Sequence, residues 1–169
     1  MCSLQGLGTS QKYHGSYERV ASSIRDFVSG EKLMIARKQF FSMLVLSAMV
    51  KNGDAHLKNF GVLYRSSTGV VTLAPAYDIV TTAVYIRNDV PALTLAGAKK
   101  WWNRKTLEQF ALVHLSLPVA MIAEIFEQTA TAVLGVRAEI QVHCAEHAAF
   151  KEVGEQMADI WQQGVDGLR

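Results

Sequence analysis

Two aspartates and one asparagine carry the side chains best suited to chemistry: Asp54, Asn59 and Asp78. A carboxylate can accept a proton from an attacking hydroxyl group, and carboxylate and amide oxygens are ligands that magnesium prefers. We therefore interpret Asp54 as a candidate catalytic residue, and Asn59 with Asp78 as candidate metal ligands. Such a set suits phosphoryl transfer, which depends mainly on positioning and charge neutralisation.

The spacing of these residues is typical of protein kinases. Asp54 and Asn59 form the D-x-x-x-x-N pattern of a kinase catalytic loop, which is weak evidence alone. Within it, Lys58 is a second candidate catalytic residue that could neutralise charge on the phosphoryl group, and His56 is assigned to cofactor contact or, alternatively, to a hydrogen-bonded structural role. Asp78 follows a predicted hairpin, where a kinase fold places its metal-binding aspartate. The order of helix, polar loop, hairpin and aspartate is specific.

The elements that must position these residues follow from the spacing of apolar side chains. Residues 32–51 are apolar nearly all round, which predicts a helix enclosed by protein. After the polar segment 52–59, short apolar runs at 60–64 and 70–73 predict a β-hairpin. A further strand is predicted at 92–96. The candidate site therefore lies between a core helix and a small sheet.

The rest of the chain is predicted to be helical. A short helix begins at Tyr17 and ends at Gly30, Asn103 caps another helix, and Pro118 begins the next. Apolar side chains from Phe150 to Trp161 recur at helical spacing. The fold class is α+β and predominantly helical. We expect one domain over residues 1–169, divided into an entry loop (1–16), helices (17–51), catalytic and metal-binding loops with a hairpin (52–80) and a mainly helical part (81–169).

Composition narrows the class of protein. Half of the 169 residues are hydrophobic and 19% are charged, which indicates a packed globular domain and excludes general disorder. The formal charge of +2 is too small to predict nucleic-acid or membrane-surface binding. Cys2 and Cys144 lie at opposite ends of the chain, so no disulfide framework is expected. The longest apolar run, Phe40 to Val50, is short for a membrane span. We expect a cytoplasmic protein.

Two sequence segments carry a resemblance to a known family. GDAHLKNF at 53–60, followed by APAYD at 74–78, closely resembles the signature of the HipA-like serine/threonine kinases, the toxins of bacterial toxin–antitoxin modules. The likeness extends to the entry loop at 8–13, to residues 93–100 and to the helical tail. The resemblance implies a protein-kinase-like C-lobe, with ATP and Mg²⁺ as cofactors and transfer of the γ-phosphoryl group to a protein serine or threonine.

The same resemblance implies roles and partners. Asp54 matches the catalytic aspartate of the family, and Asn59 and Asp78 match its metal-binding residues. A DNA-binding antitoxin is the implied partner, and a protein of the translation apparatus, such as an aminoacyl-tRNA synthetase, is the implied substrate.

The sequence departs from a complete kinase before its core helix. Gly6-Leu7-Gly8 is a lone G-x-G without a third glycine or a preceding strand, and no strand lysine with a partner glutamate follows. We expect a truncated gene product or one half of a split kinase, with the N-terminal lobe supplied in trans. The chain alone is then expected to be inactive, and the face that receives this lobe should be apolar.

Two other function classes remain as alternatives. A relic lobe could bind an antitoxin or another subunit without turnover. Asp54 and His56 also form the D-x-H that begins metallophosphoesterase sites, although no early strand or later histidine cluster accompanies it. Trp101 and its basic neighbours could contact nucleic acid or a partner, or could form a solvated helix entry. His143 and His147 share a helix face that could hold a metal or could simply be surface.

Overall fold

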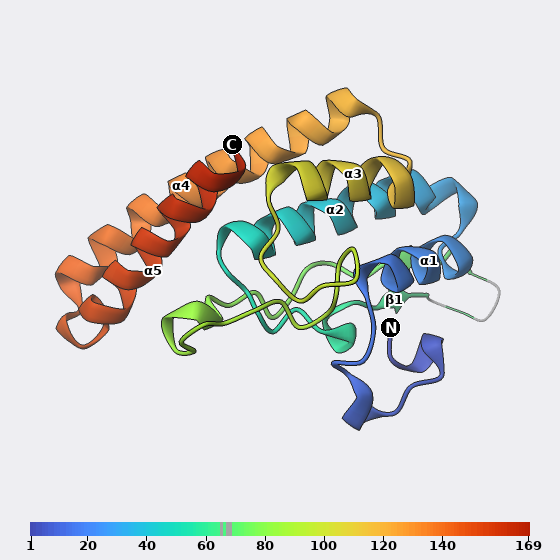
Figure 1. Cartoon of the computed structure of the whole chain (residues 1–169), viewed down its shortest axis with the longest axis horizontal. Helices are drawn as coiled ribbons and strands as arrows, with labels where there is room; N and C mark the ends of the chain where they lie inside the picture. Colours follow the sequence, from blue (N-terminus) through green and yellow to red (C-terminus); the bar gives the residue numbers. More distant parts are fainter. Residues whose placement is uncertain (65, 67–68) are drawn as a thin grey trace.

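The computed structural model describes residues 1–64, 66 and 69–169. The fold is mostly helical with one small antiparallel sheet, which confirms the predicted α+β class (Figure 1). The helices are α1 (Tyr17–Phe27), α2 (Leu33–Met49), α3 (Arg104–Leu115), α4 (Val119–Glu146) and α5 (Ala148–Leu168), and the strands are β1 (Val62–Leu63) and β2 (Thr72–Leu73).

Helix α2 is the centre of the core, as its all-round apolar character predicts. Phe40, Phe41, Leu44 and Met49 are fully buried along it. The other four helices all pack against α2, which lies in the middle of the molecule in Figure 1. Burial of such side chains contributes roughly 1.5–3 kcal/mol each, so α2 is a rigid base for the loop that leaves its C-terminus.

The predicted hairpin is confirmed with shorter strands. β1 and β2 are antiparallel, with Val62 opposite Leu73 and Leu63 opposite Thr72. The predicted turn at 65–69 lies partly outside the described residues. The hairpin connects the end of the polar loop to the segment that carries Asp78, so it sets the distance between the candidate site residues.

The prediction of a strand at 92–96 is wrong. Thr94 forms only an isolated parallel bridge with Ser16, and Leu95 pairs back on Ala98. The chain turns between these two residues, where Ala96 adopts a φ of 49°. A tight turn leaves no room for a second strand of matching length, so the β-like apolar pattern ends in single bridges.

The predicted helix boundaries hold in part. Ser16 caps α1 and Asn103 caps α3, each accepting a hydrogen bond from the backbone N–H three residues later. Helix α1 ends at Phe27, before Gly30, because Val28 adopts extended backbone. Gly30 instead begins a short 3₁₀ turn. Helix α5 is longer than the apolar spacing from 150 to 161 indicated.

Helices α4 and α5 form a long antiparallel pair at one end of the molecule (Figure 1). Helix α4 has 28 residues and is long and apolar enough to cross a membrane by length and composition. The same length and composition occur in core helices, and α4 packs here against α2 and α5. The sequence pattern did not indicate that α4 could span a membrane, because polar residues interrupt its apolar residues.

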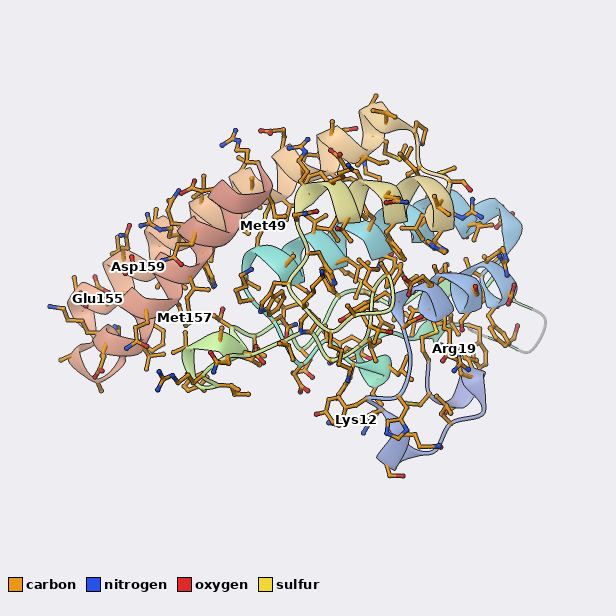
Figure 2. The ribbon with its side chains drawn as sticks, viewed as in Figure 1. Lys12, Arg19, Met49, Glu155, Met157 and Asp159 are labelled. Carbon is orange, nitrogen blue, oxygen red and sulfur yellow. The ribbon has the colours of Figure 1, made fainter. Side chains whose placement is uncertain are left out.

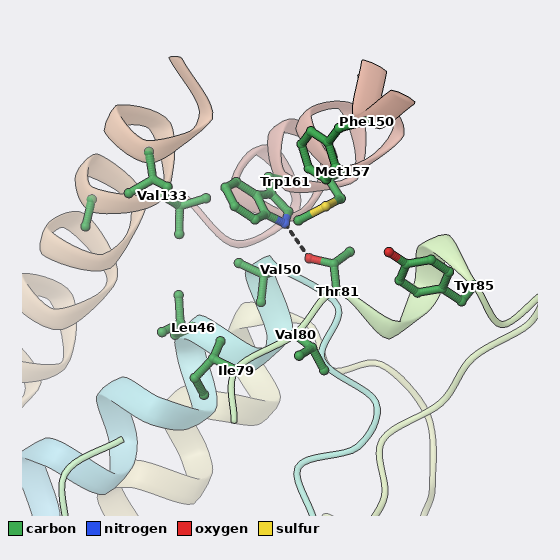
Figure 3. Close-up of a pocket in the computed structure, with 12 residues that line it drawn as sticks. Leu46, Val50, Ile79, Val80, Thr81, Tyr85, Val133, Phe150, Met157 and Trp161 are labelled. Atoms are coloured by element: carbon green, nitrogen blue, oxygen red, sulfur yellow. Dashed lines mark hydrogen bonds between the residues drawn. The ribbon is translucent and has the colours of Figure 1, made fainter. Parts of the chain in front are cut away.

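An apolar pocket of about 560 Å³ opens between this pair, the end of α2 and residues 79–85 (Figure 3). A hydrogen bond of 2.7 Å from Trp161 Nε1 to Thr81 Oγ1 crosses one side of it. This bond ties α5 to the segment that directly follows Asp78. The C-terminal helix thus takes part in positioning the candidate site.

Candidate functional site

The loop between α2 and β1 is folded by its own polar side chains. Asn59 ends a 3₁₀ turn, and its Oδ1 accepts a hydrogen bond of 2.9 Å from the His56 backbone N–H. Asn52 Oδ1 accepts one of 3.2 Å from the Asp54 N–H. Leu57, between these positions, is fully buried and anchors the loop in the core. The loop is therefore a fixed structure whose functional side chains are held in place.

The two predicted metal ligands, 19 residues apart, lie in direct contact. Asn59 Nδ2 donates a hydrogen bond of 2.6 Å to Asp78 Oδ2. Asp78 adopts a φ of 58°, a left-handed conformation that is uncommon for residues other than glycine. The Asn52 side chain also donates to the Asp78 carbonyl oxygen at 3.5 Å. Backbone strain of this kind persists only where surrounding contacts fix it, and it is concentrated at functional sites.

The donor atoms of this pair fit magnesium. Asp78 is exposed, and its second carboxylate oxygen makes no hydrogen bond to the described residues. The Asn59 oxygen accepts one hydrogen bond and keeps a second lone pair. Magnesium usually takes one or two protein oxygens and completes its shell with water and substrate phosphates. An exposed carboxylate beside a buried amide that keeps one free lone pair therefore suits a cation that arrives with a nucleotide.

Asp54 lies on the same loop and makes two contacts of its own. Its Oδ1 accepts a hydrogen bond of 2.8 Å from the Tyr13 hydroxyl, and its Oδ2 lies 4.0 Å from His56 Nε2. The Asp54 side chain is 43% exposed, so the carboxylate is open on its remaining side. A partly exposed carboxylate on a rigid loop can accept a proton from a substrate hydroxyl.

His56 is buried, with only 5% of its surface exposed. Burial lowers the pKa of His56, against the opposing effect of the Asp54 charge, so the ring is neutral near pH 7. Its ring meets the Tyr13 ring edge-on at 5.2 Å, and its Nδ1 has no hydrogen-bond partner in the described part of the chain. The ring supports the Tyr13–Asp54 contact, and its assignment to cofactor contact stays a prediction.

Two lysines reach the site from different loops. Lys58 is exposed and forms no ion pair with the described residues, which leaves its ammonium group free to contact a phosphoryl group. Lys12 lies on the entry loop (Figure 2), with Nζ 4.6 Å from the centre of the Tyr13 ring. Hydrogen bonding to Tyr13, together with the charges of Tyr13, Asp54 and Asp78, raises the pKa of Lys12. No pattern in the sequence singles out Lys12 or Tyr13, although both lie in the entry loop that carries the family resemblance.

A second set of residues, also missed from the sequence, holds the start of the candidate loop. The Thr82 hydroxyl accepts a hydrogen bond of 2.6 Å from the Gly53 N–H and donates one of 2.5 Å to Asp89 Oδ2. A Cβ atom on Gly53 would lie 2.2 Å from that oxygen, so a larger residue here would displace the Asp89 carboxylate from its bond to Thr82. Trp101 Nε1 donates to the Asp89 carbonyl oxygen at 2.8 Å. Segment 82–101 therefore fixes the backbone directly before Asp54.

The structure shows what surrounds two side-chain pairs whose roles the sequence left open, Trp101 with Trp102 and His143 with His147. Trp102 is buried, and Trp101 is half-buried and bonded to the Asp89 backbone, an arrangement consistent with a solvated helix entry that buries one Trp. The rings of His143 and His147 stack 3.8 Å apart. Within the described ranges, no cluster of three or more His, Cys, Asp or Glu side chains could hold a metal, which gives no support to the metallophosphoesterase alternative.

The fold and the site define a predominantly helical α+β domain that presents a D-x-x-x-x-N loop and a later aspartate. Residues 1–136 match the HipA-like C-terminal domain family, and the chain belongs to that family. Residues 137–169, which include the end of α4 and all of α5, lie beyond the match. The resemblance found in the sequence is confirmed at the level of the family.

Two curated relatives are named as kinases. A protein named "Putative kinase Y4dM" from Sinorhizobium fredii is 33% identical over 93 residues, which are 54% of this chain and 22% of that protein. A protein named "Putative kinase" from Haemophilus influenzae is 28% identical over 79 residues, which are 47% of this chain and 22% of that protein. The matched segments thus span about a fifth of the length of these relatives. Their names support a relationship to kinases.

Proposed function

We propose that this chain is the C-terminal catalytic lobe of a HipA-like serine/threonine protein kinase. The contact between Asn59 and Asp78, with Asp54 on the same rigid loop, is the observation that carries the proposal. It brings two candidate magnesium ligands together, with a candidate base on the loop that carries one of them. Membership of the HipA-like family and the names of the relatives support the same function.

Each site residue has a defined role in the proposed reaction. Asp54 accepts the proton of a seryl or threonyl hydroxyl as its oxygen bonds to the γ-phosphorus of ATP and ADP leaves. Asn59 and Asp78 would hold magnesium, which neutralises charge on the phosphate oxygens when bound. Lys58 stabilises negative charge on the phosphoryl group in transfer. Segment 82–89 keeps the Asp54 backbone in position through Gly53.

The proposal extends to the biological role that the family implies. The chain would act in the cytoplasm as the toxin of a toxin–antitoxin module, with a DNA-binding antitoxin as partner. Its substrate would be a protein of the translation apparatus, such as an aminoacyl-tRNA synthetase. The face that receives an N-terminal lobe would be apolar, a proposal that draws support from exposed apolar side chains on the hairpin and on the segment after Asp78: Leu63, Tyr64, Val70, Val80 and Ile86.

Magnesium-dependent nucleotide binding tests the metal-ligand roles. Titration calorimetry should show that ATP binds in the presence of Mg²⁺ and that Asp78→Ala weakens this binding about 100-fold or more, with loss of the dependence on Mg²⁺. Asp159→Ala, which removes an exposed carboxylate of α5 (Figure 2), is the matched control and should bind as the unchanged chain does. Equal Mg²⁺-dependent affinity in the Asp78→Ala variant would contradict the assignment.

The same titration distinguishes the proposal from a non-catalytic interaction module. The apolar pocket of about 560 Å³ favours that second function, because a binding module needs exposed apolar surface. Mg²⁺–ATP binding, by the chain alone or with a family N-terminal lobe added as a second chain, supports the kinase. Its absence under both conditions would favour the interaction module.

Activity of the purified 169-residue chain provides a further prediction. These residues contain no glycine-rich phosphate loop and no strand lysine. The adenine and phosphates of ATP would therefore contact this chain on one side only. We expect negligible transfer from radiolabelled ATP to protein by this chain alone, and an increase when a family N-terminal lobe is added. Robust transfer by the 169-residue chain alone would overturn this prediction.

A further inference from the structure

The Tyr13 hydroxyl stands where a substrate hydroxyl would have to stand. It donates a hydrogen bond of 2.8 Å to Asp54 Oδ1. A general base must lie about 2.6–3.2 Å from the oxygen whose proton it takes. The phenol therefore occupies the side of the carboxylate that the proposed reaction needs, and no other described side chain donates a hydrogen bond to it.

Contacts on three sides hold Tyr13 in this position. The carbonyl oxygen of the preceding Lys12 accepts a hydrogen bond of 3.1 Å from the Leu57 N–H, which ties the entry loop to the catalytic loop. Lys99 Nζ donates to the Tyr13 carbonyl oxygen at 3.4 Å. The ring meets the buried His56 ring edge-on. The first two contacts fix the backbone at Tyr13 and the third restrains its ring, which lowers the conformational entropy that the Asp54 contact costs.

Space for a substrate segment lies beside the same contact. Tyr13, Asp54, Thr82, Asp89 and Lys99 are among the residues that line an open cavity of about 450 Å³. Its volume is in the range of protein ligand sites, about 300–1,000 Å³, and is sufficient for a side chain with its flanking backbone. A seryl or threonyl hydroxyl that enters this cavity would lie beside both Asp54 and Tyr13, because both residues line it.

We propose that Tyr13 is a placeholder for the acceptor hydroxyl: it covers Asp54 when no protein substrate is bound and is displaced by the substrate hydroxyl. This inference rests on the proposed function, in which Asp54 is the base. Its consequence is selectivity between acceptors. Tyr13 occupies Oδ1 of Asp54 and leaves the other side of the carboxylate open, so the placeholder slows the activation of water, and with it the hydrolysis of ATP without a protein substrate, but does not abolish it.

Chemical labelling of Asp54 tests the cover without requiring activity. Carbodiimide coupling of glycine ethyl ester to carboxylates, followed by mass spectrometry, should label Asp54 about two- to tenfold faster in Tyr13→Phe than in the unchanged chain, the range expected for loss of one hydrogen bond. Asp26, whose side chain is 55% exposed, is the internal reference. Thr131→Val removes an exposed hydroxyl of α4 and should leave the Asp54 rate unchanged. An unchanged rate in Tyr13→Phe would overturn the inference.

Hydrolysis of Mg²⁺–ATP then tests the proposed role of Tyr13 as a placeholder. In the protein assembled with its N-terminal lobe, phosphate release without protein substrate should rise about two- to tenfold in Tyr13→Phe and stay the same in Thr131→Val. Unchanged or slower release in a protein that binds Mg²⁺–ATP would overturn the inference while leaving the proposed function standing. Phosphate found on Tyr13 itself would also overturn it, because the residue would then be an acceptor. Failure to bind Mg²⁺–ATP would refute the proposed function and the placeholder with it.

Discussion

Replacing Asp54 by asparagine is expected to lower phosphoryl transfer by the assembled protein about 100- to 10,000-fold, the usual contribution of a general base. Asparagine keeps the shape of the side chain, and its amide oxygen can still accept the hydrogen bond of the Tyr13 hydroxyl. It cannot take up the proton of a substrate hydroxyl. The loss should therefore appear in kcat, measured with radiolabelled ATP, while Mg²⁺–ATP affinity stays close to that of the unchanged protein.

The control for this variant is Asp26→Asn on α1. Asp26 pairs with the neighbouring Arg25 at 3.1 Å on the exposed surface, and an exposed pair contributes little to stability. Neither variant should change the thermal midpoint by more than a few degrees. An Asp54→Asn protein with full activity would remove the base from the proposed reaction. A large fall in its thermal midpoint would instead make Asp54 a structural residue.

Substituting alanine for Gly164 is expected to destabilise the fold by about 1–3 kcal/mol or more. A Cβ atom at this position would lie 1.9 Å from the backbone oxygen of Met49, at the end of α2. Backbone cannot yield as a flexible side chain can, so α5 would have to move away from α2. The free energy of unfolding, measured by urea titration, should fall accordingly.

Gly167, one turn further along α5, is the matched control. It is exposed, and a Cβ atom there would have no neighbour within 4 Å. Alanine at Gly167 should leave stability unchanged or raise it by up to about 1 kcal/mol, because alanine loses less backbone entropy than glycine in a helix. Equal stabilities of the two variants would mean that α5 does not approach α2 as closely as described.

The Gly164 substitution should also affect the candidate site, through a chain of named contacts. Trp161, on the same helix, donates its indole hydrogen bond to Thr81. The next residue, Thr82, bonds to Gly53 in front of Asp54. A shift of α5 would therefore loosen segment 79–82 and weaken Mg²⁺–ATP binding. Gly167→Ala should leave that affinity unchanged, which provides a test of the connection.

Local sequence was sufficient to predict the candidate loop and its immediate supports. The spacing of Asp54 and Asn59, the apolar character of α2 and the hairpin before Asp78 all depend on residues near one another in the chain. Turns, caps and amphipathic spacing are set by short-range sterics and hydrogen bonds, which leave a pattern in the sequence. The Asn59–Asp78 contact followed once the hairpin between them was recognised.

The tertiary structure alone decided which distant side chains complete the site. Tyr13 is 41 residues from Asp54, and Thr82 is 29 residues from Gly53. A tyrosine in an irregular loop and a threonine after an aspartate leave no periodic signal, since such contacts depend on how helices α1, α2 and α5 pack. The strand prediction at 92–96 failed for the same reason: a strand requires a partner of matching length, and that partner is determined by packing. The sequence by itself therefore determined the chemistry of this protein's candidate site, whereas the fold determined which groups cover, position and restrain it.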